Sequence, residues 1–178
     1  MASYAVATTL LCALVIFSLE RSVFAEEYVE MTLYTETANA GGPNPTLARS
    51  VSIGKPTWFG SIHMRDRHMV DRLGSNANTI GRVLCTDFKV VADIENTWYT
   101  YMTLWFKSGR FNGSTLQVGG LNTPGDAEWA ILGGTGNLRM ARGIVHRKLL
   151  EKEQFSVYAY YTPMPYVVAS GRELDTNL

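Results

Sequence analysis

Apolar and polar side chains alternate along much of the chain after its first 27 residues. Between Tyr28 and Thr37, the apolar residues Val29, Met31 and Leu33 occupy every second position. A period of two residues predicts a β-strand with one buried face. The most pronounced run is Thr97 to Lys107, which is rich in the aromatic and β-branched residues that favour strands.

The same reasoning places strands at 46–53, 58–64, 80–91, 115–118, 129–132, 139–148 and 154–162. Arg65-Asp66-Arg67 is interpreted as a charged turn, and His68 to Asn78 as a loop. No segment carries a helical stripe. About eight strands separated by turn signals predict an all-β fold, either a sandwich or a barrel. We expect an eight-stranded antiparallel β-barrel, because a closed barrel leaves no exposed sheet edge.

Both faces of the strand from Thr97 to Lys107 are largely apolar. Tyr99, Tyr101 and Trp105 share one face, and the residues between them share the other. Two apolar faces fit a barrel that lines a lumen with one face and packs against a neighbouring subunit with the other. The alternative is a sandwich core with a few exposed aromatic residues.

A glycine cluster interrupts the pattern near residue 134. Gly133, Gly134 and Gly136 are expected to form a tight turn with positive φ between two strands. Glu128 and Arg142 flank this turn, so a hairpin would bring them close together. Such a pair is either a structural ion pair or part of a binding site.

The bulk properties indicate one secreted domain. A chain of 178 residues with a formal net charge of zero suits a single globular domain and argues against a nucleic-acid binder. An apolar segment from Ala5 to Leu19, followed by Val23-Phe24-Ala25, predicts a signal peptide over residues 1–25. We therefore expect a barrel domain over 26–165, a tail over 166–178, and no membrane association after cleavage.

Cleavage after Ala25 would remove Cys12 and leave Cys85 without a disulfide partner. Cys85 is expected to be a small buried residue. The three histidines lack metal-binding spacing, so we predict neither a metal site nor a cofactor. Asn112-Gly113-Ser114 is a glycosylation sequon in a predicted turn, and Asn112 is the expected glycan site.

Several ordered motifs resemble the plant dirigent family. They are Tyr34-Thr35-Glu36, Gly41-Gly42-Pro43-Asn44-Pro45-Thr46, Trp58-Phe59-Gly60, Ile80-Gly81-Arg82, Phe111-Asn112-Gly113-Ser114-Thr115-Leu116 and the stretch from Glu128 to Gly143. The match covers nearly all of the mature chain. It departs from the family pattern at Thr35-Glu36, where dirigent proteins usually carry His-Asp, and in Asp66 to Val70 and Val83-Leu84-Cys85.

The resemblance implies a secreted, apoplastic eight-stranded barrel that is commonly trimeric. Such a homotrimer would steer the coupling of phenoxy radicals, of the monolignol type, to lignans or related phenolics. A separate oxidase, a laccase or peroxidase, would make the radicals. Other family members are enzymes that close rings through quinone-methide intermediates.

Carried onto this chain, the resemblance assigns catalytic or orienting roles to Glu36, Glu128 and Arg142. It assigns substrate contacts to Tyr99, Tyr101 and Thr135, and it places the lumen tyrosine of the family at Tyr101 or else at Tyr99. Three function classes follow: a barrel that orients radicals without an oxidative centre of its own, an isomerase or lyase using Glu36 and Glu128 as acid and base, and a structural or defence barrel without ligand chemistry. A carboxylic acid enclosed by aromatic side chains has a raised pKa, which suits proton transfer.

Overall fold

The computed structural model describes residues 26–35, 47–51, 59–92, 97–149 and 153–163. The strands are β1 (Glu27–Thr35), β2 (Leu47–Val51), β3 (Ile62–Val70), β4 (Thr79–Phe88), β5 (Trp98–Phe106), β6 (Thr115–Asn122), β7 (Ala127–Thr135), β8 (Arg142–Leu149) and β9 (Glu153–Tyr161). Two short 3-10 turns, η1 (Gly109–Phe111) and η2 (Gly136–Leu138), follow β5 and β7. The predicted signal peptide and tail lie outside the described residues.

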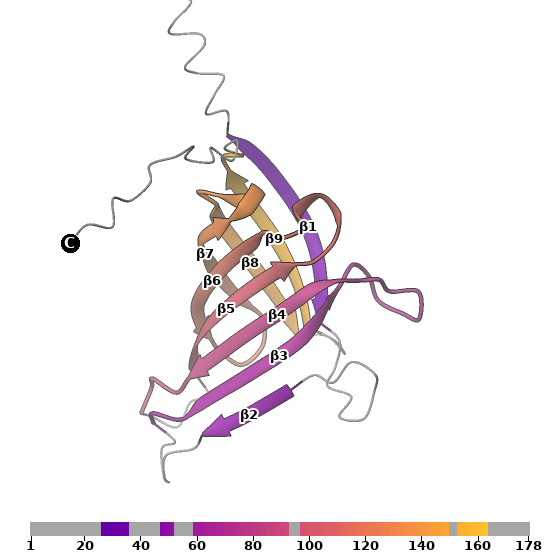
Figure 1. Ribbon diagram of the computed structural model, residues 1–178. Helices are drawn as coiled ribbons and strands as arrows, with labels where there is room; N and C mark the ends of the chain where they lie inside the picture. Colours follow the sequence, from indigo (N-terminus) through magenta and orange to yellow (C-terminus); the bar gives the residue numbers. More distant parts are fainter. Residues whose placement is uncertain (1–25, 36–46, 52–58, 93–96, 150–152, 164–178) are drawn as a thin grey trace, which may run out of the picture.

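The strands form one antiparallel sheet that closes on itself (Figure 1). The order is β1-β9-β8-β7-β6-β5-β4-β3, and β1 then pairs with the end of β3 through Tyr34–Val70 and Thr35–Met69. The predicted eight-stranded antiparallel β-barrel is confirmed. β2 pairs with the other half of β3 and lies beside the barrel as a ninth strand.

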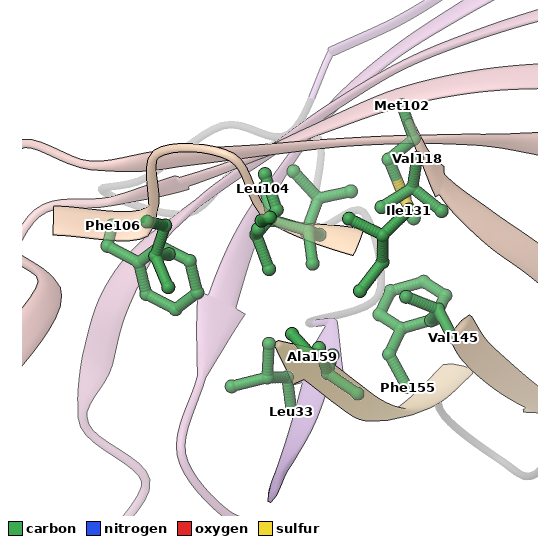
Figure 2. Packing of buried hydrophobic residues seen from close by; sticks show 14 of the residues in the cluster. Leu33, Met102, Leu104, Phe106, Val118, Ile131, Val145, Phe155 and Ala159 are labelled. Carbon is green, nitrogen blue, oxygen red and sulfur yellow. The ribbon is translucent and has the colours of Figure 1, made fainter. Parts of the chain in front are cut away.

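Alternation along the strands fills the lumen with apolar side chains. On β5, the buried residues are Thr100, Met102, Leu104 and Phe106, and they alternate with the exposed Tyr99, Tyr101 and Trp105. Figure 2 shows the same packing from the other strands, with Val118, Ile131, Val145 and Phe155 around a shared core. Burial of this apolar surface is the main stabilising contribution to the barrel.

The middle of β3 differs from the sequence prediction. Arg65, Asp66 and Arg67 were expected to form a turn, but they lie within a nine-residue strand. Arg65 pairs with Cys85 and Arg67 with Val83 in the register with β4. That prediction is wrong because pairing with two neighbouring strands outweighs the local preference of charged residues for turns.

The glycine cluster also differs in detail. Gly133 and Gly134 belong to β7, and of the three glycines only Gly136 has a positive φ, at 63°. A β-carbon on Gly134 would collide with the carbonyl oxygen of Leu138. Gly134 is therefore required for close backbone approach rather than for a left-handed turn.

The two ends of the barrel are built differently. At the closed end, the buried side chains of Phe111 and Leu138 from η1 and η2 cover the lumen. Arg110 there bonds both Glu27 and the hydroxyl of Tyr161, and that hydroxyl donates to Glu27 at 2.6 Å. The opposite end, here called the mouth, is where β3, β5, β7 and β9 begin.

No helix among the described residues is long and apolar enough to span a bilayer.

Candidate functional site at the mouth of the barrel

Polar side chains replace apolar ones where the lumen reaches the mouth. The same alternation that points Met69, Val83 and Val145 into the core continues to inward positions on β3, β4, β5, β8 and β9. The mouth cluster is defined by these inward residues: Arg65, Arg67, Cys85, Asp87, Thr100, Arg147 and Glu153.

Asp87 anchors one side of the mouth cluster and is itself only 4% exposed. Arg65 donates to one of its carboxylate oxygens at 2.6 Å, and Thr100 donates to the other at 2.6 Å. Arg65 also approaches the sulfur of Cys85 at 3.3 Å. Charge-assisted hydrogen bonds of this kind hold a buried carboxylate in a fixed orientation.

Glu153 is shared by three guanidinium groups. Arg67 donates to one of its oxygens at 2.6 Å. The other oxygen lies 3.5 Å from Arg65 and 3.8 Å from Arg147. Arg147 also donates to the carbonyl oxygens of Thr123 and Gly125 in the β6–β7 loop. The cluster therefore ties five strands and one loop together at the mouth.

Burial and charge affect the ionisable groups of the cluster in different directions. Burial raises the pKa of the Cys85 thiol to about 12, and this outweighs the lowering effect of Arg65. Burial works to lower the pKa of Arg65, but Cys85, Asp87 and Glu153 raise it above its ordinary value overall. Arg65 thus stays charged, and Cys85 stays a neutral thiol rather than a nucleophile.

An open cavity of about 320 Å³ lies over this cluster. Its walls include Arg65, Asp87 and Arg147, together with His63 and Trp98. The rings of His63 and Trp98 stack with centroids 4.4 Å apart. The volume is at the lower end of the range for small-molecule sites, and the mixture of aromatic walls with few fixed charges is typical of them.

The tyrosines expected to line the lumen point away from it. Tyr99 and Tyr101 are 37% and 43% exposed and alternate with the buried Thr100 and Met102. The prediction that Tyr101 or Tyr99 faces the lumen is wrong, because the register of β5 turns both side chains to the outer surface.

The two charged residues beside the glycine cluster are also on the outer surface and do not pair. Glu128 lies opposite His146, with 3.2 Å between a carboxylate oxygen and the imidazole. Arg142 bonds Glu26 and lies opposite Tyr160. Arg142 and His146 are four positions apart along β8, a distance of roughly 13 Å in a strand. The expected Glu128–Arg142 proximity is therefore wrong, although a role for either residue stays a prediction.

The remaining predicted residues fall elsewhere. Thr135 is exposed at the end of β7, where its hydroxyl lies 2.6 Å from that of Thr115. Asn112 is exposed in the turn between η1 and β6. Glu36 lies outside the described residues.

The sequence reasoning missed the site residues at the mouth: Arg65, Arg67, Asp87, Thr100, Arg147, Glu153, His63 and Trp98. A signal for the first two was present: they continue the alternation that includes His63 and Met69. The two-residue period was not recognised there, because Arg65, Asp66 and Arg67 were interpreted as a turn. Arg147 similarly occupies the position two residues after the buried Val145.

The chain is thus a small closed antiparallel barrel with a packed lumen and a polar, hollow mouth. The profile of the family described as dirigent-like protein matches residues 28–162. This chain belongs to the dirigent family.

Similar proteins agree with this assignment. Dirigent protein 15 of Arabidopsis thaliana is 30% identical over 134 residues, which cover 69% of this chain and 70% of the relative. Dirigent protein 7 of Arabidopsis thaliana is 23% identical over 133 residues, covering 74% and 71%.

Solved structures support the fold. The pterocarpan synthase dirigent protein GePTS1 is 22% identical and aligns with a TM-score of 0.65 over 78% of this chain and 93% of its own. The Diels Alderase AbmU from Streptomyces koyangensis is 18% identical, with a TM-score of 0.51 over 88% and 80%. At these identities the likeness shows the barrel alone.

Proposed function

We propose that this protein is a secreted dirigent protein that binds phenoxy radicals at the mouth of its barrel and directs their stereoselective coupling. Radicals of the monolignol type would come from a separate laccase or peroxidase, and the products would be lignans or related phenolics. The observation that carries the proposal is the cavity at the mouth, where stacked aromatic rings adjoin hydrogen-bonding groups held by a rigid ion-pair network.

The physical reasoning concerns orientation. A phenoxy radical is delocalised, so free coupling gives mixtures of products. A cavity that fixes the partners in one relative orientation favours one product, and about 1.4 kcal/mol of preference gives tenfold selectivity. Trp98 and His63 offer a surface for a phenolic ring, while Asp87 and Arg65 offer a hydrogen-bond acceptor and donor for its oxygen atoms.

The test is an oxidase-driven coupling reaction with chiral analysis of the products. Asp87→Asn should remain folded by circular dichroism but lose product control. Glu30→Gln, on the outer surface of β1, is the matched control for removing a carboxylate. Glu128→Gln and Arg142→Ala test the sequence-based site: if these variants lose enantiomeric excess while Asp87→Asn keeps it, the site is on the outer surface and not at the mouth.

A second candidate function is a stereospecific cyclase acting through a quinone methide. Two carboxylates at the mouth, Asp87 and Glu153, favour it because one could accept a phenolic proton while a neighbouring donor holds the quinone-methide oxygen. This places the acid–base pair at residues other than Glu36 and Glu128. Conversion of a phenolic quinone-methide precursor without any oxidase would favour the cyclase over radical coupling.

We also propose that the barrels assemble as a homotrimer. The support is an apolar outer patch in which Tyr99 and Leu132 lie over Gly119 and Leu121 is the cross-strand partner of Tyr99. Exposed apolar patches of this kind commonly mark interfaces. Light scattering at micromolar concentration should give a trimer, and Leu121→Glu should give a monomer.

We also propose that the protein is secreted and that it is glycosylated at Asn112. Asn112 is exposed. The hydroxyl oxygen of Ser114 in the same sequon is buried and accepts a hydrogen bond from the backbone N–H of Asn137 at 3.0 Å. We therefore expect the glycan to be added before the barrel folds around Ser114. The intact mass of the secreted protein, before and after glycosidase treatment, reports cleavage at Ala25 and glycosylation together.

A further inference from the structure

The mouth cluster carries more positive than negative charge. Among the described residues of the cluster, three guanidinium groups, from Arg65, Arg67 and Arg147, face two carboxylates, from Asp87 and Glu153. Glu153 serves as the shared counterion for all three. Arg65 also pairs with Asp87, so the cluster as a whole holds one more cation than carboxylates.

The hydrogen-bond pattern indicates the same imbalance. The Nε atoms of Arg65 and Arg147 are buried and have no hydrogen-bond partner. The Arg147 side chain is only 6% exposed. Buried donors without acceptors are costly, and guanidinium groups are best satisfied by planar anions such as carboxylates.

The cavity places this excess charge beside aromatic rings. Arg65 and Arg147 line the same cavity as the stacked His63 and Trp98. The guanidinium of Arg147 also lies 5.6 Å from the ring centre of Trp129. A ligand that matches both features has an aromatic ring at one end and an anionic group at the other.

We propose that the mouth selects phenolic acids over neutral phenolic alcohols of the same size. The ligand class is a hydroxycinnamate, whose carboxylate engages Arg65 and Arg147 while its ring packs against Trp98. This inference rests on the proposed function in taking the mouth as a phenolic-binding site, and it changes the preferred phenolic from a neutral monolignol to the corresponding carboxylate.

The test compares ferulate with coniferyl alcohol, which share the same ring but carry a carboxylate and a hydroxymethyl group. Binding at pH 7 is measured by quenching of tryptophan fluorescence and by calorimetry. Ferulate should bind at least about tenfold more tightly, because its hydrogen bonds to arginine are charge-assisted. Added salt should weaken ferulate binding and leave alcohol binding nearly unchanged.

Two variants shift the preference in opposite directions. Arg65→Gln should reduce the preference to about twofold or less, since it removes one cation. Glu153→Gln removes the shared counterion and should raise the ratio of ferulate affinity to coniferyl alcohol affinity several-fold, so the inference stays testable if Arg65→Gln does not fold. Arg82→Gln is the matched control, because Arg82 forms a comparable pair with Asp66 at 2.8 Å on the outer side of β4.

The outcomes separate the two proposals. Equal affinity for the acid and the alcohol would overturn the charge preference and leave the proposed function standing. Absence of binding by either compound, in a folded protein, would count against the mouth as a phenolic site and against both proposals. A ferulate preference that is unchanged in both Arg65→Gln and Glu153→Gln would place the anion site elsewhere.

Discussion

The closed end and the mouth use the same alternation of inward side chains for different purposes. At the closed end, inward positions carry Phe111, Leu138 and Tyr161, which pack against one another and exclude water. At the mouth, inward positions carry Arg65, Asp87 and Glu153, which satisfy one another only in part. The first arrangement stabilises the barrel, whereas the second leaves polar groups available to a ligand.

Under the proposed function, one barrel separates stability at the closed end from binding at the mouth. Burying charged groups is costly, and an ion pair in the interior often contributes less than an apolar pair of equal size. A network of five charged residues at the mouth is therefore weak evidence for a structural role. Its position beside a cavity makes ligand binding the better explanation.

The largest effect is expected at the closed end. Leu138→Ala removes a fully buried side chain and should lower the free energy of unfolding by about 2–5 kcal/mol. Ligand affinity should not change, because the mouth cluster is at the other end. Urea denaturation measures the first quantity and fluorescence titration the second. A change in affinity without loss of stability would show that the two ends are coupled.

The next effect concerns the ion pairs at the mouth. Glu153→Leu leaves three arginines without their shared counterion and should destabilise the protein by about 3 kcal/mol. Adding Arg67→Met removes one of those cations and should recover at least half of the loss. Thermal or urea unfolding of the single and double variants makes the comparison. If the double variant is less stable than the single one, the network is structural.

A smaller effect is expected from Cys85 in alkaline solution. Because burial raises its pKa from 9.0 to about 12, the folded state holds the thiol proton more tightly than the unfolded state. Its contribution to stability is complete below pH 9 and is lost as the pH rises towards 12. Cys85→Ala should therefore lose less stability than the wild type over that interval. A thiol reagent applied at pH 8 should react slowly with the folded protein and quickly after denaturation.

The smallest effect is expected in the β3–β4 hairpin. The side chain of Asp71 accepts hydrogen bonds from Arg72 and from the backbone and side chain of Asn78. These contacts, that from Arg72 first, lower its pKa well below the ordinary value, so they stabilise the protein above about pH 4 and fade in more acidic solution. Asp71→Asn should slightly lower the melting temperature at pH 7 and have less effect at pH 3. A large loss would mean that this exposed hairpin contributes to the core.

Much of the barrel could be predicted from sequence, because period-two alternation in β1, β4 and β5 reports directly which side chains are buried. The site could not, for two physical reasons. When both faces of a strand are apolar, alternation does not show which face points into the lumen. The prediction therefore placed Tyr99 and Tyr101 in the lumen instead of on the outer surface. Register across a hairpin depends on where the turn begins, so Glu128 and Arg142 were brought together although β7 and β8 hold them apart.

The pairing of β1 with β9 has a consequence for how the protein must be made. Glu27 lies opposite Tyr161, so the first and last described strands are neighbours although 134 positions separate these residues in the chain. Of the described strands, β9 leaves the ribosome last, and until then β1 has no partner along that edge. The barrel can therefore close only after β9 has been synthesised. Closure is expected to be slow, because it depends on contacts between residues far apart in the sequence. During that interval the unpaired edges of β1 and β8 are exposed, and a chain truncated before β9 should aggregate rather than form a smaller barrel.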